Sequence, residues 1–253
     1  DIQASSTNNY QDLGGLVGYA SAYVRNISAS GTVAADGTYS YRIHGTGNYV
    51  GGIAGVIAVT NTSGGYQLHV DTVKVISENS ETSSVSGIGI AVGTGNISSD
   101  IDKVNAPAKE ERSTVSGSVL VKIGGGTSIG GLVGNGTVRY ADVSDCRIQG
   151  NQDLNNYVGG VSGYGSAYDC TSTKNVIIGN KWTGGAVGYS GWNDLSYTTV
   201  SRCVVQGDDY TGGITGTGRI LKNQLVSQTV VEGKQNVGGM LGAIIGDVSR
   251  DSN

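Results

Sequence analysis

The residue types that could carry out nucleophilic, acid–base or metal chemistry are sparse in this chain of 253 residues. It has two histidines, His44 and His69, and neither lies in a His-Glu-x-x-His zinc motif. The three cysteines, Cys146, Cys170 and Cys203, have no Cys-x-x-Cys spacing and no histidine partners, which argues against zinc. We therefore expect no bound metal.

Adjacent acids such as Asp208 and Asp209 could cleave a polysaccharide if they lay in a groove. Two neighbouring acids in a turn are, however, far more often solvated surface. The glycine run 124–126 is not followed by the Gly-Lys-Ser/Thr of a phosphate-binding loop, and no nucleophile-elbow pattern is present. We assign no catalytic and no cofactor-binding residue, expect no cofactor, and expect that the protein is not an enzyme.

Any functional residue must be positioned by a repeated element, the pentad Gly-Gly-(aliphatic)-x-Gly. Successive copies in the second half are separated by 29, 25, 28 and 26 residues, and a degenerate copy at 87–93 fills the gap in the first half. Such a period predicts a repeat architecture. The seven clear copies begin at Gly14, Gly51, Gly130, Gly159, Gly184, Gly212 and Gly238.

Between the pentads, alternating segments such as 138–143 and 199–205 are punctuated by Gly, Asn, Asp and Ser, which predicts strands and turns. A unit of this length cannot bury its own apolar face and must stack on its neighbours. We predict a single all-β solenoid, or β-helix, over 1–253. It has about eight irregular Gly-Gly-x-x-Gly rungs and is roughly 40 Å long. Extended loops are expected near 56–86 and 94–128.

The composition excludes several other classes. The chain has 44 glycines, no Phe and 14 Tyr, and its net charge of −4 gives no electrostatic reason to expect nucleic acid or an anionic membrane as partner. No apolar run approaches the roughly 18 residues of a transmembrane helix. The chain begins without Met and ends part-way into a repeat, so we expect a fragment of a larger protein.

The Gly-Gly-Leu-Val-Gly copies at 14–18 and 130–134 resemble the GLUG repeat. That family occurs in bacterial surface proteins, filamentous-haemagglutinin-like adhesins and the non-catalytic parts of IgA-specific metallopeptidases. The resemblance covers nearly the whole chain at the level of the pentad and its spacing. It implies a bacterial, extracellular repeat domain and does not imply one particular activity.

The cysteines share a local context. Val143-Ser-Asp-Cys146 matches Val200-Ser-Arg-Cys203, while Cys170 and, in the first repeat, Ile27 fit the same slot. The equivalence to Ile predicts an inward column of small apolar residues. Free buried thiols are the first interpretation, and one disulfide stays open as the alternative.

The best candidates for a binding surface are aromatic residues two positions before the pentad. The residue directly before the pentad is aliphatic or Thr in every clear copy and is predicted to point inward, so its neighbour should point outward. Cross-rung stacking that only stabilises the fold is the alternative to a sugar-stacking or protein-docking role. The candidate ligand-binding residues are Tyr49, Tyr157, Trp182 and Tyr210, the last three on consecutive rungs. A second column directly after the pentad, Tyr19, Tyr164 and Tyr189, is expected to pack at a corner.

The expected function is that of a non-enzymatic adhesin or stalk on a bacterial surface or in the extracellular space. Its partners would be a host or cell-surface glycan, a protein, or neighbouring domains of the same protein. Two alternatives stay open. A carbohydrate-active β-helix enzyme would need acids and a Lys or Arg in one groove beside the aromatic residues. A self-assembling structural subunit would use the open strand edges of the repeat stack.

Overall fold

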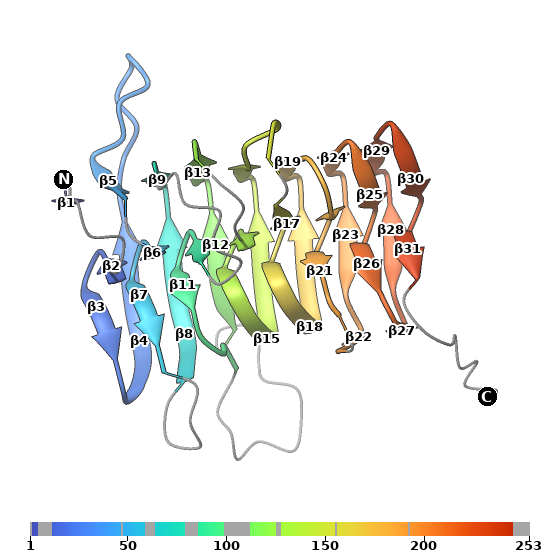
Figure 1. Cartoon of the computed structure of the whole chain (residues 1–253). Coiled ribbons are helices and arrows are strands. Elements are labelled where there is room, and N and C mark those ends of the chain that lie inside the picture. The colour runs from blue at the N-terminus through green and yellow to red at the C-terminus, as the bar shows by residue number, and fades with distance from the viewer. Residues whose placement is uncertain are drawn as a thin grey trace.

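The computed structural model describes residues 2–4, 12–46, 48–58, 64–78, 86–98, 112–124, 128–154, 156–191 and 193–244. Within these ranges all regular secondary structure is β-strand, which confirms the predicted all-β class. The same ranges contain no helix that is long and apolar enough to cross a membrane. The strands form three sheets, and Figure 1 shows matching strands of successive repeats side by side from the blue N-terminal end to the red C-terminal end.

The first and second sheets each take one strand from every repeat, and neighbouring strands are parallel. The first sheet has the order β1 (Ile2–Ala4), β5 (Tyr41–Gly45), β9 (Val73–Ser77), β13 (Val119–Lys122), β16 (Arg147–Gln149), β19 (Val176–Ile178), β24 (Val204–Gln206) and β29 (Val230–Glu232). The second has the order β2 (Asp12–Gly14), β6 (Tyr49–Gly51), β10 (Gly87–Gly89), β14 (Ser128–Gly130), β17 (Tyr157–Gly159), β20 (Thr183–Gly184), β25 (Asp209–Gly212) and β30 (Gln235–Gly238).

The third sheet is larger because most repeats contribute two segments to it. Its main path is β3 (Val17–Ala20), β7 (Ala54–Ile57), β11 (Val92–Thr94), β15 (Val133–Ser144), β18 (Ser162–Thr173), β21 (Val187–Tyr189), β26 (Thr215–Gly218) and β31 (Leu241–Ile244). Beside this path lie β4 (Tyr23–Ser30), β8 (Gly64–Asp71), β12 (Ser113–Ser116), β22 (Asp194–Ser196), β23 (Thr199–Ser201), β27 (Ile220–Lys222) and β28 (Leu225–Ser227). The long strands β15 and β18 span both halves of the sheet.

Every pentad is the turn that joins the second sheet to the third. Its first glycine ends a strand of the second sheet, and its fourth residue begins a strand of the third. The degenerate copy folds in the same way, since Gly89 pairs with Gly51 on one side and Gly130 on the other. The backbone hydrogen bonds continue through the turn, where the Val161 amide donates to the Ala186 carbonyl at 2.8 Å.

The glycines are required because neighbouring backbones approach closely at this turn. A Cβ on Gly160 would lie 2.1 Å from the carbonyl oxygen of Gly185, and one on Gly163 would lie 2.1 Å from the amide nitrogen of Ile129. Atoms cannot approach so closely, so a side chain at either place would force the repeats apart. The pentad therefore sets how tightly the second and third sheets pack.

The residue before each pentad points inward as predicted. Adjacent members of this column pair in register, and all but the last have exposed fractions below one tenth. Thr183 and Thr211 carry buried hydroxyls that have no hydrogen-bond partner among the described residues. The column is Leu13, Val50, Ile88, Ile129, Val158, Thr183, Thr211 and Val237.

All three cysteines are buried with free thiols, but they occupy two columns rather than one. The strand register places Cys146 opposite Asn175, whose side-chain oxygen accepts a hydrogen bond from the Cys146 amide at 2.9 Å. Asn175 is in turn opposite Cys203. Cys170 pairs with Ala141 in the third sheet, and the same column leads back to Ile27. Placing Cys170 in the slot of the other two was wrong, because local sequence context does not reveal that it lies inside the long strand β18.

Burial keeps these thiols protonated. It raises the pKa of the Cys146 and Cys170 thiols to about 12, and it also raises the pKa of Cys203. Because the thiolate is the reactive form, none of the three is a nucleophile at neutral pH.

The stretches near 56–86 and 94–128, expected to be extended loops, contain strands wherever they are described. The first contains β8 and β9, and the second contains β12 and β13. The loop expectation missed these strands because the first half of the chain spaces its pentads more widely. The segments 59–63, 79–85, 99–111 and 125–127 lie outside the described residues.

The close packing at the turn can be tested with two glycines at the same pentad position. Gly160→Ala should lower the free energy of unfolding by about 1–3 kcal/mol, because the new methyl group meets the Gly185 carbonyl. Gly239→Ala should leave it unchanged or raise it slightly, since nothing lies within 4 Å of that position. Urea unfolding measures both. Equal destabilisation by the two substitutions would contradict this account of the pentad.

Candidate functional site

Five aromatic side chains meet beside the pentad turns of three consecutive repeats, and we call them the aromatic cluster. Tyr157 lies in β17, Trp182 directly precedes β20, and Tyr210 lies in β25. Tyr164 lies in β18 and Tyr189 in β21. The ring centroid of Tyr157 is 4.7 Å from that of Trp182. It is 5.6 Å from that of Tyr164 and 5.2 Å from that of Tyr189, so Tyr157 connects the two rows.

The fold brings together two rows that the sequence analysis kept apart. Tyr157, Trp182 and Tyr210 each precede members of the inward column that pair in register. Tyr164 and Tyr189 pair directly with each other on the other side of the turn. Because the pentad reverses the chain sharply, residues on either side of it lie close in space. The seven-residue separation across each turn was the signal that could have joined the two rows.

Most ring faces in the cluster are covered by other rings. Trp182 lies between Tyr157 and Tyr210, and its plane is within 9° of the Tyr210 plane at a centroid distance of 6.1 Å. The rings of Tyr164 and Tyr189 are stacked at 5.5 Å. Each such pair contributes about 0.5–1.5 kcal/mol beyond the burial of area. Tyr164 has 37% of its surface exposed, so it is the ring that offers a ligand the most surface.

A cation and strained backbone accompany these rings. The Lys181 Nζ lies 4.6 Å from the centroid of the Trp182 ring and 5.8 Å from that of Tyr210. Trp182 and Tyr210 have φ values of 33° and 50°, a left-handed conformation that costs about 1–2 kcal/mol per residue. Burial, with smaller contributions from Tyr189 and Tyr164, raises the pKa of Tyr157, so its hydroxyl remains a donor.

Tyr49, the fourth candidate from the sequence, does not belong to this cluster. It lies in β6, where it pairs with Asp12 on one side and Gly87 on the other. Burial raises its pKa, and Asp12 adds to that effect. Tyr19, from the row after the pentad, lies in β3 at the N-terminal end of the stack with 59% of its surface exposed.

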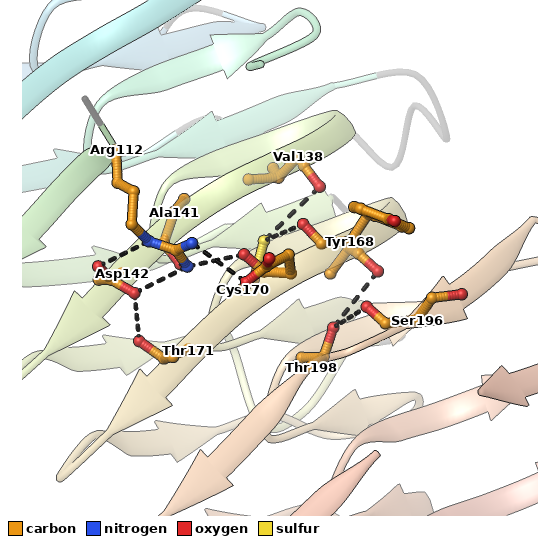
Figure 2. A network of polar contacts seen from close by, with 11 residues as sticks. Arg112, Val138, Ala141, Asp142, Tyr168, Cys170, Thr171, Ser196 and Thr198 are labelled. Carbon is orange, nitrogen blue, oxygen red and sulfur yellow. Dashed lines mark hydrogen bonds and ion pairs between the residues drawn. The ribbon is translucent and has the colours of Figure 1, made fainter. Parts of the chain in front are cut away.

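A separate polar network lies on the far half of the third sheet, and Figure 2 shows it from close by. Arg112 Nε donates to Asp142 Oδ2 at 3.0 Å, and Nη2 donates to Oδ1 at 3.0 Å. The guanidinium also donates to Asp169 Oδ1 at 3.1 Å and to the carbonyl oxygens of Asp169 and Ala141 at 2.7 and 3.3 Å. The Thr171 hydroxyl donates to Asp142 Oδ1 at 2.6 Å.

This geometry makes Arg112 a structural clasp between strands. Burial alone would lower its pKa, but the hydrogen bonds and charges of Asp142 and Asp169 outweigh that effect and raise it. The paired contact to Asp142 is the bidentate arrangement that guanidinium groups favour. The guanidinium is therefore charged and turned toward protein acceptors rather than toward a ligand. The network borders a groove of about 650 Å³, the Arg112 groove, lined by Arg112, Thr114, Val115, Ser116, Asp142, Ser144, Asp169 and Thr171.

The acids and histidines noted in the sequence are not gathered into one site. The Asp208 carboxylate pairs with Lys234 Nζ at 2.6 Å. His44 Nε2 lies 2.9 Å from a Glu78 carboxylate oxygen in one part of the fold, and His69 Nδ1 lies 2.9 Å from the Thr114 hydroxyl in another. Across the described residues, no group of three or more His, Cys, Asp or Glu side chains could hold a metal ion.

Comparison with known proteins adds no assignment: no family model, curated protein or solved structure matches the chain.

The clasp can be tested by removing its cation. Arg112→Met should lower the free energy of unfolding by about 1–3 kcal/mol, because it leaves two partly buried carboxylates without their donors. Arg147→Met is the matched control, since the exposed Arg147 side chain bonds, among the described residues, only to Gln149, and it should change stability by less than about 0.5 kcal/mol. Thermal and urea unfolding measure both. An unchanged Arg112→Met protein would show that the network does not hold the strands together.

Proposed function

We propose that this chain is a β-solenoid repeat domain of a bacterial surface or secreted protein, acting as a non-enzymatic adhesin or stalk. The register supports the solenoid, because each sheet takes its strands from successive repeats and pairs them in parallel. Seven clear pentads and an eighth, degenerate copy would correspond to about eight rungs of a single domain. Such a stack forms an extended rod with one long face, and a short repeated sequence is enough to encode it.

Membership of the GLUG family, and with it an extracellular or cell-surface location, is part of this proposal. It rests on the pentads and their spacing. The structure adds a physical reason for that motif, since the pentad is the turn at which neighbouring backbones approach too closely for side chains. A solenoid of this kind needs glycine in most of its turns, although the degenerate copy has Ile90 in place of the second glycine.

The observation that carries a binding role is the aromatic cluster on three consecutive repeats. Stacked tyrosines and a tryptophan present a rigid surface with little side-chain entropy to lose, which suits a glycan or a protein partner. Tyr164 provides the most accessible ring, and Lys181 adds a positive charge above Trp182.

A carbohydrate-active enzyme is less well supported by the same geometry. Two carboxylates and an arginine do share a groove, but Asp142 and Asp169 both accept hydrogen bonds from Arg112. Glycoside hydrolysis needs one carboxylic acid that carries a proton toward the leaving group. Carboxylates that both receive donors from one guanidinium are placed for an ion pair rather than for that role.

A glycan array tests the proposed binding role. The intact protein should bind a defined set of glycans, and Tyr164→Ala should weaken that binding about tenfold by removing the most exposed ring of the aromatic cluster. Tyr19→Ala is the matched control, because Tyr19 holds the same position after its pentad but lies outside the cluster. It should bind like the unaltered protein. Circular dichroism and thermal unfolding check that each variant is folded.

A triple variant, Tyr157→Ala/Trp182→Ala/Tyr210→Ala, removes the row found in the sequence. Loss of binding in this variant while it remains folded would also support the cluster as the site. If the unaltered protein binds no glycan and no protein ligand, the cluster serves only to pack the repeats, and the adhesin proposal fails.

End-to-end assembly is a second candidate, because apolar side chains are exposed at both ends of the stack. Leu16 and Tyr19 are 56% and 59% exposed at the N-terminal end. Leu225, Val230 and Ile244 are 54%, 50% and 52% exposed on the last strands. Outer strands of this kind can pair with a second copy. Sedimentation velocity should then show concentration-dependent association that Val230→Lys weakens, whereas a monomer at all concentrations would exclude it.

A further inference from the structure

A second surface lies on the far half of the third sheet, where β4, β8, β12, β15 and β18 are neighbours. Along each strand one inward residue separates two outward polar residues, as Val115 separates Thr114 from Ser116 in β12. The parallel register aligns these residues in two columns, which we call the hydroxyl face. One column is Ser28, His69, Thr114, Asp142 and Thr171, and the other is Ser30, Asp71, Ser116, Ser144 and Thr173.

The hydroxyl face is hollowed along the direction that crosses the strands. The Arg112 groove covers β12, β15 and β18. A second hollow of about 230 Å³ covers β4, β8 and β12, and the two share Thr114 and Ser116. Together they cross five strands, which at about 4.8 Å per strand amounts to about 19 Å. That length suits a short stretch of a linear polymer.

The hydrogen bonds within the face leave it rich in acceptors. The Ser116 hydroxyl donates to Asp71 Oδ1 at 2.7 Å, and the Thr171 hydroxyl donates to Asp142 Oδ1 at 2.6 Å. A hydroxyl has one proton and two lone pairs, so each of these side chains keeps only accepting capacity for a ligand. A ligand that bonds to these two hydroxyls must therefore supply the donors.

The net charge of the hydroxyl face also favours a particular kind of ligand. Among the described lining residues, Arg112 and, when protonated, His69 are the cations, against the carboxylates of Asp71, Asp142 and Asp169. This leaves an excess of two negative charges when His69 is neutral and of one when it is protonated. Asp71 has no cationic partner within the described part of the chain and is exposed to solvent. The two other carboxylates share Arg112. Complementary charge on a ligand is therefore positive.

Other cations of the neighbouring strands are engaged elsewhere. The Arg139 guanidinium lies 5.3 Å from the centroid of the Tyr168 ring. Lys174, which follows β18, lies 3.7 Å from a carboxylate oxygen of Asp145. Both side chains therefore have partners other than Asp71.

We propose that the hydroxyl face binds a linear polymer of amino sugars that carry free ammonium groups. Ammonium groups and sugar hydroxyls supply donors to the carboxylates and to the hydroxyls of Ser116 and Thr171, and the positive charge offsets the excess of carboxylates. An extended sugar chain also fits a groove that crosses strands at a regular interval. The site shares no residue with the aromatic cluster and does not depend on it.

The test measures binding of a glucosamine hexamer by titration calorimetry at about pH 5.5, where the sugar amines are protonated and Asp side chains are ionised. The fully N-acetylated hexamer is the neutral comparison and should bind at least about tenfold more weakly. Asp71→Asn should weaken binding of the glucosamine hexamer about three- to fivefold, since one exposed charge contact is lost. Raising the salt concentration should weaken it further.

Two control variants separate this site from the rest of the surface. Asp145→Asn removes a carboxylate that pairs with Lys174 outside the groove, and Tyr164→Ala alters the aromatic cluster; both should bind the hexamer as the unaltered protein does. Equal binding of the two hexamers, an equal loss in Asp145→Asn, or no binding would overturn the proposal. Tighter binding of hexalysine than of the glucosamine hexamer would also overturn it and make a basic peptide the ligand.

Discussion

At most turns between the second and third sheets, neighbouring repeats lie so close that backbone meets backbone without room for a side chain; Ile90 in the degenerate copy and Gly239 in the last repeat are the exceptions. A Cβ on Gly131 would fall 2.1 Å from the carbonyl oxygen of Gly160, and the same distance recurs between Gly160 and Gly185. Hydrogen bonds between repeats run through this turn, so a wider spacing would break them as well as the packing. The register of all three sheets, and with it every column of side chains, follows from keeping these backbones in contact.

The fixed parallel register aligns equivalent residues of successive repeats into continuous surfaces. Because each strand pairs with its equivalent in the next repeat, the aromatic positions beside the pentad accumulate into one cluster. On the far half of the third sheet the same register accumulates hydroxyls and carboxylates. The two surfaces differ in chemistry because one lies beside a turn where few side chains fit, and the other lies on an open sheet face.

Within each surface, contacts between repeats compete with contacts to a ligand. In the aromatic cluster, Trp182 lies between two tyrosines, so its ring faces already make stacking contacts within the protein and are less available to a ligand. Tyr164 keeps more of its surface for a partner. On the hydroxyl face, Arg112 is engaged by carboxylates and carbonyl oxygens, whereas the Asp71 side chain, among the described residues, receives only a hydroxyl donor. The proposed ligands would contact the rings and charges that have few partners within the protein.

The sequence by itself determined the all-β class, the position of the turns and the inward column before each pentad, because glycine spacing and period-two alternation are local and recur in every repeat. It could not place Cys170, the strands between 64 and 77, or the partners of Arg112, since these depend on how wide the irregular repeats are once paired. Only the tertiary structure decided that Tyr164 meets Tyr157, and that Asp71 and Asp142 line two adjoining hollows of one sheet face. These residues are separated along the chain by turns or whole repeats, and backbone pairing between repeats, rather than local preference, brings them together.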